Sequence, residues 1–312
     1  MMKLDKFTKD KPYLFFLTSA IFLTLMISVL VGTVFWMAYP TVSKTGIIEF
    51  IFGTEWGKEG GSYGIWIFIV GTFYMTAVTM CMAVPLGLFT AIYLSEFAHS
   101  KVRSIMKSSI ELLVGIPSVV YGIFGLFILK DYLRDYVNPL ISNTLGSFIP
   151  LFHDSGGSGT GVFLASVILT IMVIPTIISI AENAMRSVSQ EYREGSIALG
   201  TTKWETIQKI VIPTALPGIV AGITLGMTRA VGETMAIVML LGNTYKIPTS
   251  IFDTGYAMTS KILNDITYHF ANPEVCSALF GIAAVLFIIE AIFIGIIRII
   301  SSMCSSGGGR NA

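Results

Sequence analysis

Six long apolar segments limit what this 312-residue chain can fold into. The first of them, residues 13–39, contains no charged side chain. A helix of about 20 residues crosses the roughly 30 Å hydrocarbon core of a bilayer. Because 54% of the residues are hydrophobic and 12% are charged, an ordinary soluble domain is excluded. The pattern predicts an all-α polytopic membrane protein with six transmembrane helices, at about residues 13–39, 64–94, 110–129, 162–181, 215–241 and 275–300.

Basic residues gather on one side of the predicted helices. With both termini in the cytoplasm, thirteen of the twenty Lys and Arg residues fall inside, six fall outside, and Arg229 lies within a span. Loops rich in Lys and Arg stay in the cytoplasm. We therefore predict cytoplasmic termini at residues 1–12 and 301–312, the latter a disordered tail. Residues 130–160 are predicted to form a solvated outer loop that ends in a flexible glycine-rich tract.

The fifth predicted span, residues 215–241, carries an unusual face. At about 100° per residue, Gly218, Gly222, Gly226, Arg229 and Glu233 fall on one narrow side of a continuous helix. Glycines four residues apart let another helix approach closely. The three glycines are therefore candidate helix-packing residues, and the same packing is expected to bury the two charges.

Charge inside a membrane is costly, so it indicates a functional site by default. Arg229 and Glu233 are four residues apart and can partly neutralise each other. They form either a structural ion pair or part of a path for an anionic solute, with Arg229 as its counter-charge. Ser118 follows Pro117 in the third span, where it either lines the same path or bonds a backbone carbonyl freed by a kink. Glu290 in the sixth span faces the bundle in our interpretation, and a structural hydrogen bond is expected there.

The sequence lacks two motifs that would indicate catalytic chemistry. The chain contains no phosphate-binding Gly-x-x-x-x-Gly-Lys-Ser/Thr motif and no His-Glu-x-x-His. Its three cysteines lack metal-binding spacing, and nothing suggests nucleic-acid binding. We therefore expect no enzyme, metal or cofactor in this chain. Uphill transport would draw its energy from a partner subunit or an ion gradient.

The charged segment 182–213 resembles the EAA loop of ABC importer permeases. The matching positions are Glu194, Gly195, Ser196, Gly200, Ile210 and Pro213. A short helix ending at Gly200, with Trp204 and Ile207 beyond it, can dock in a groove of a soluble partner and push on the fifth span through Pro213. The alternative is an ordinary amphipathic connector on the membrane surface.

Further blocks are similar to the permeases of phosphate ABC importers, and one set is closer to the PstC type than to its sister PstA. The shared blocks are Arg229–Ala236, Glu111–Gly122 and Pro85–Glu96, and the PstC-like set is Phe52–Trp56, Tyr63–Gly64 and Gly71–Thr72. The resemblance covers about residues 10–300. It implies a type I ABC importer permease fold in a prokaryotic cell membrane, working by alternating access.

The resemblance also implies partners. They are a PstA-like permease in a heterodimer, two PstB-like ATPases that bind ATP and Mg, and a PstS-like phosphate-binding protein outside. In that family, the residues matching Arg229 and Glu233 take part in the passage of inorganic phosphate. A permease for another oxyanion, such as molybdate or sulfate, is the alternative within this class. A secondary transporter or channel would leave the EAA-like spacing without a purpose.

Overall fold

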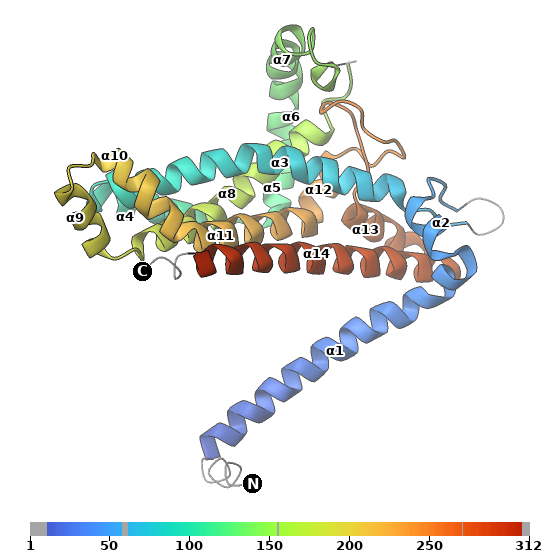
Figure 1. Ribbon diagram of the computed structural model, residues 1–312. Coiled ribbons are helices and arrows are strands. Elements are labelled where there is room, and N and C mark those ends of the chain that lie inside the picture. Colours follow the sequence, from blue (N-terminus) through green and yellow to red (C-terminus); the bar gives the residue numbers. More distant parts are fainter. Residues whose placement is uncertain (1–10, 58–61, 155, 270, 308–312) are drawn as a thin grey trace.

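Four long helices lie side by side in the computed structural model, which describes residues 11–57, 62–154, 156–269 and 271–307. They are α3 (Trp66–Ile92), α8 (Val162–Arg186), α11 (Ile212–Gly232) and α14 (Pro273–Gly307), as Figure 1 shows. Helix α8 lies at the centre and packs against both α3 and α11. Its inward side chains include Ile168, Val173 and Ile177, which are fully buried. The core of the molecule is therefore the seam around α8.

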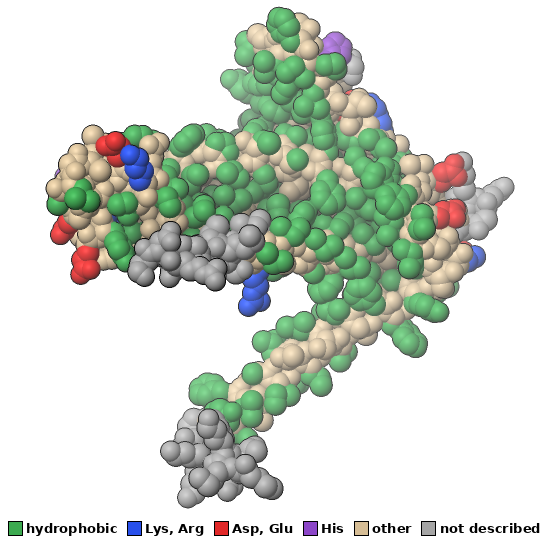
Figure 2. Space-filling model, viewed as in Figure 1, with side chains coloured by type: hydrophobic (Ala, Val, Ile, Leu, Met, Phe, Trp, Pro, Cys, Tyr) green, Lys and Arg blue, Asp and Glu red, His purple; other side chains and the backbone are tan. Residues whose placement is uncertain are grey.

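The surface pattern fits a membrane environment. Figure 2 shows hydrophobic side chains over the flanks of the bundle, with most of the visible acidic side chains at its two ends. Within the described residues, five helices are long and apolar enough to cross a bilayer. They are Tyr13–Thr45, Trp66–Phe97, Val162–Arg186, Lys203–Gly232 and Pro273–Ile296.

The third predicted span is broken. Helix α4 (Ser100–Val114) is followed by a helical stretch from Ser118 to Thr144, and the two are bent by 91°. Pro117 stands at the break with an extended ψ of 141°, because proline cannot donate the next helical hydrogen bond. The prediction of one helix over 110–129 is therefore wrong. Six spans are reached only when the bent pair counts as one.

The connection after the break was also predicted wrongly. From Ser118 the chain is helical as far as Thr144, through α5 (Ser118–Phe124), η2 (Gly125–Leu129), α6 (Lys130–Tyr132), η3 (Leu133–Val137) and α7 (Asn138–Thr144). The first half of the predicted loop 130–160 is therefore helical. Leu133 is buried in the cluster around α8, which keeps this stretch folded. The end of the glycine-rich tract is bound to the end of α12, because the Gly161 N–H donates to Leu240 O at 2.9 Å.

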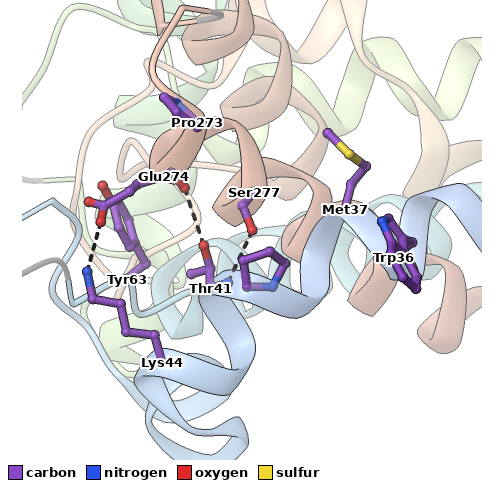
Figure 3. A pocket seen from close by; sticks show the side chains of 9 residues that line it. Trp36, Met37, Thr41, Lys44, Tyr63, Pro273, Glu274 and Ser277 are labelled. Atoms are coloured by element: carbon purple, nitrogen blue, oxygen red, sulfur yellow. Dashed lines mark hydrogen bonds and ion pairs between the residues drawn. The ribbon is translucent and has the colours of Figure 1, made fainter.

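Helix α1 (Lys11–Thr45) leaves the bundle, as Figure 1 shows. None of its most apolar stretch is buried inside the chain. Only its C-terminal part meets α14, where the Thr41 N–H donates to Ser277 Oγ at 3.1 Å and Lys44 pairs with Glu274 at 2.8 Å. Figure 3 shows this junction, which surrounds a cavity of about 310 Å³. The chain alone therefore leaves most of α1 without a protein partner.

Other boundaries moved by a few residues. Helix α8 continues to Arg186, beyond the predicted end at 181. Helix α14 continues to Gly307, so the predicted disordered tail 301–312 is helical over its first part, and residues 308–312 lie outside the described residues. Most of the predicted N-terminal segment 1–12 also lies outside them. Two short helices, α2 (Ile47–Phe52) and α13 (Met258–His269), occupy connections predicted as polar.

Candidate functional site

The fifth span is interrupted at Glu233. Helix α11 ends at Gly232, Glu233 is extended with φ −65° and ψ 134°, and α12 (Met235–Leu240) then begins. The prediction of one continuous helix over 215–241 is therefore wrong. The freed groups find other partners, because Glu233 Oε1 accepts from the Ala236 N–H at 3.3 Å and Glu233 O accepts from Thr259 Oγ1 at 2.8 Å. Broken spans are tolerated when the backbone is satisfied in this way.

Arg229 lies in the last turn of α11 and is half-buried. Its guanidinium donates to Thr176 Oγ1 of α8 at 3.2 Å. Among the described residues, no carboxylate lies within 4.0 Å of the Arg229 guanidinium. The predicted pair with Glu233 does not form, because the break takes Glu233 out of the helical register. A cation without a bound carboxylate therefore stands beside the break.

One further side chain lies near this break. A Cβ added at Gly232 would come within 3.4 Å of Glu290 Oε1, so the α14 carboxylate faces the bundle there. Among the residues that the structure describes, Glu290 has no hydrogen bond, contrary to the expectation. The carboxylate belongs instead to the polar surroundings of the break, a grouping that the sequence could not show because 57 positions separate it from Glu233.

The three glycines face α8. An added Cβ would lie 2.4 Å from Ala184 Cβ at Gly218, 3.1 Å from Ile180 Cβ at Gly222, and 2.9 Å from Val173 and Ile177 side-chain atoms at Gly226. Real Cβ atoms almost never approach other atoms within 3.0 Å. The close packing of α11 on α8 therefore leaves little or no room for side chains at these positions, and it places Arg229 opposite Thr176.

Ser118 begins α5 and is half-buried, and it makes no hydrogen bond among the described residues. The expected alternative, a bond to a backbone carbonyl freed by the kink, is therefore not seen. Tyr121, one turn further along, donates to Leu113 O at 3.0 Å across the α4–α5 break. Helix α5 packs against α12, the helix that begins directly after the break. The kinked third span and the interrupted fifth span therefore lie side by side.

The segment at the other end of the molecule forms a helical hairpin. Helix α9 (Gln190–Ala198) stops at Gly200, whose φ of +86° is a conformation that favours glycine. Helix α10 (Lys203–Thr206) starts with a capping box, in which Thr202 Oγ1 accepts from the Glu205 N–H and Glu205 accepts from the Thr202 N–H. Through η5 (Ile207–Val211), α10 runs directly into α11.

The hairpin exposes some predicted docking residues and buries others. Trp204 is 49% exposed, whereas Ile207 is 1% exposed and was wrongly expected to dock. Ser196 is also buried, with its Oγ 2.7 Å from Thr201 Oγ1 and 3.0 Å from Thr206 Oγ1, so it joins the two helices rather than facing outward. Glu194, Gly195 and Gly200 are exposed, together with three apolar side chains that the sequence did not single out, Tyr192, Ile197 and Leu199.

An ion pair fixes the hairpin to the membrane helices. Arg193 Nη1 lies 2.5 Å from Glu96 Oε2, and Arg193 Nη2 donates to Met185 O at 2.7 Å. Lys203 Nζ donates to the Glu96 carbonyl at 2.6 Å. Glu96 belongs to η1 (Tyr93–Phe97), the continuation of α3. These contacts tie the hairpin to both α3 and α8.

Within the described residues, no group of three or more His, Cys, Asp or Glu side chains is placed to hold a metal ion.

Comparison with known proteins identifies relatives. Residues 83–302 match the family of binding-protein-dependent transport system inner membrane components. The chain is 35% identical to the probable ABC transporter permease protein YqgH of Bacillus subtilis over 263 residues, covering 84% of this chain and 80% of that one. It is 32% identical to the phosphate transport system permease protein PstC of Pasteurella multocida, covering 93% and 91%. An inward-facing structure of the MetNI methionine ABC transporter shares the fold, with a TM-score of 0.53, 18% identity and coverage of 77% and 97%.

Proposed function

The chain belongs to the binding-protein-dependent transport system inner membrane components, and from this membership we propose that it is a permease subunit of an ATP-driven phosphate importer. Phosphate is the substrate named for the PstC relatives. The observation that carries the proposal is the Arg229 guanidinium, which stands beside a broken membrane helix with no carboxylate bound among the described residues.

The chemistry at the break suits an oxyanion. A guanidinium presents a planar fork of donors that matches phosphate oxygens. We assign Arg229 as the attracting group on the path, with Ser118 as a neutral lining residue. Glu233 and Glu290 supply negative charge nearby, which keeps binding weak enough for release, as any conduction path requires.

The hairpin α9–α10 is the proposed contact with the ATPase. Glu194, Gly195, Gly200 and Trp204 are the surface residues of this contact, and Ser196 holds its two helices together. From Lys203 to Gly232 the helix is continuous. At 1.5 Å per residue, Lys203 and Arg229 are roughly 39 Å apart along it. A displacement of the hairpin is therefore delivered to the substrate site by a single element.

This arrangement supports alternating access. ATP and Mg bind to a PstB-like ATPase dimer at the cytoplasmic end, and closure of the dimer moves the hairpin and reorients α11. A PstA-like permease completes the path and covers α1, and a PstS-like protein delivers inorganic phosphate at the outer end. Both termini lie in the cytoplasm, and the complex resides in a prokaryotic cell membrane.

Substitution of Arg229 tests the proposal. We expect Arg229→Gln to abolish phosphate uptake by cells that express the full complex, while co-purification of the ATPase is retained. The matched control is Arg298→Gln, which removes an exposed arginine from α14. Uptake at the normal rate in the Arg229 variant would remove this residue from the mechanism. Competition by molybdate or sulfate would favour a permease for another oxyanion. Uptake without an ATPase would favour a secondary transporter.

A further inference from the structure

A lysine is buried in an aromatic cage at the end of the bundle opposite the hairpin. Lys261 of α13 is 1% exposed. Its Nζ lies 4.5 Å from the ring centre of Trp56, 4.8 Å from Tyr245, and 5.5 Å from both Phe68 and Tyr256. All four distances are within the range of cation–π attraction.

Polar contacts complete the cage. Lys261 Nζ pairs with Asp265 Oδ2 at 2.5 Å and donates to the Tyr245 hydroxyl. Asn264 Nδ2 donates to the Tyr256 hydroxyl at 3.0 Å. A buried charge is costly unless it is paired and hydrogen-bonded. These contacts offset that cost and fix α13 in a single position.

The cage uses sequence blocks that the transport path leaves unexplained. Trp56 faces Tyr63 across a short antiparallel bridge, and their rings are 5.1 Å apart. Gly71 lets the Tyr256 backbone approach, since an added Cβ would lie 2.2 Å from Tyr256 O. The Met258 N–H donates to Thr72 Oγ1 at 2.9 Å. The PstC-like blocks thus build the walls that hold Lys261 and the start of α13.

Helix α13 reaches the substrate site through one side chain. Thr259, two residues before Lys261, is buried and donates its hydroxyl to the Glu233 carbonyl at 2.8 Å. That carbonyl lies at the break, where the helical ladder of α11 has ended. Thr259 therefore joins α13 to the break at the end of α11.

We propose that Lys261 is a positioning residue for transport: its cage holds α13 so that Thr259 fixes the Glu233 carbonyl and the break beside Arg229. This inference rests on the proposed function, since it gives the break a role in phosphate passage. A purely structural lysine would hold the fold together without any specific link to Thr259 and the break.

The test compares Lys261→Met, Lys261→Arg, Thr259→Val and the double variant Thr259→Val/Lys261→Met in the full complex. Lys246→Met is the control, because it removes an exposed lysine from the same end of the molecule. The readouts are the maximal rate of phosphate uptake, the phosphate concentration at half-maximal rate, and amide hydrogen exchange over residues 233–240.

Loss of one hydrogen bond corresponds to roughly a fivefold change. We expect Thr259→Val to lower the maximal rate by about that factor with little change in the half-maximal concentration. Lys261→Met is expected to lower the rate at least as much, with the double variant no worse than the more impaired single variant. Lys261→Arg, which keeps the positive charge, should retain most of the uptake activity. The exchange of residues 236–238 should quicken in each impaired variant and stay normal in Lys246→Met.

Two results would overturn the proposal. One is a double variant whose loss equals the product of the two single losses, and the other is unchanged exchange at residues 236–238 in Lys261→Met. If Lys261→Met does not accumulate, the exchange of residues 236–238 in Thr259→Val and Lys261→Arg tests the proposal instead. Unchanged exchange in Thr259→Val would then overturn it. Hydrogen exchange does not depend on the substrate. Normal uptake in Arg229→Gln would therefore refute the proposed function. The hydrogen-exchange data would still test the link from Lys261 to the break.

Discussion

Replacing Arg193 with methionine should loosen the link between the proposed ATPase contact, the hairpin α9–α10, and the membrane helices. The Arg193 and Glu96 side chains are 15% and 6% exposed, and Arg193 also bonds the Met185 carbonyl. Removing one partner of a buried pair costs about 3–5 kcal/mol, because the other charge is left without compensation. Since the helix from Lys203 stays continuous to Gly232, we expect the loss to appear as a hairpin that moves without carrying α3 and α8 with it.

The assay is the ratio of phosphate imported to ATP hydrolysed by the reconstituted complex. We expect Arg193→Met to lower this ratio severalfold while hydrolysis continues. The companion variant Glu96→Gln/Arg193→Met removes both charges of this pair and should recover part of the stability. Arg186→Met is the control, since Arg186 is half-exposed and its partner Glu182 keeps Lys107. An unchanged ratio in Arg193→Met, or a double variant less stable than the single one, would refute the reasoning.

Two further outcomes are expected. Gly200 has a φ of +86°, so Gly200→Val strains the turn by about 1–2 kcal/mol and should uncouple hydrolysis from uptake, whereas normal coupling would speak against docking at this turn. Burial raises the pKa of Asp253, but hydrogen bonds from Ser250, Lys246 and Thr249 together lower it to about 2 from 3.8. Because this pKa is depressed, the stabilisation of about 2 kcal/mol is complete above pH 4 and is lost as the pH falls towards 2. Thermal unfolding of Asp253→Asn should therefore depend less on pH in this window, and parallel curves for the two proteins would contradict it.

Features encoded by neighbouring residues were predictable. The apolar segments located the spans, since length and composition alone decide whether a helix can cross a bilayer. The turn at Gly200 also followed from local spacing, and the structure places a positive φ there. Pro117 signalled a disturbance in the third span, although the size of the bend depends on the packing of α5 against α12.

Features that join distant positions were missed. The break at Glu233 depends on Thr259, 26 residues further along the chain. The Arg193–Glu96 pair joins residues 97 positions apart. Lys261 was counted only among the six basic residues predicted to lie in the outer loops, because its burial requires aromatic residues from several separate segments. In an unbroken fifth span, Arg229 and Glu233 would share one face and could pair, whereas the break at Glu233 prevents the predicted ion pair.

Helix α1 has a consequence for how such a complex comes together. The most apolar stretch of α1 buries none of its residues inside the chain, so a neighbouring protein can contact it without opening the core around α8. Two finished subunits can then meet by diffusing sideways in the bilayer, each already folded. Assembly would then require no refolding of the core, and the Thr41–Ser277 hydrogen bond marks the point at which α1 leaves the bundle.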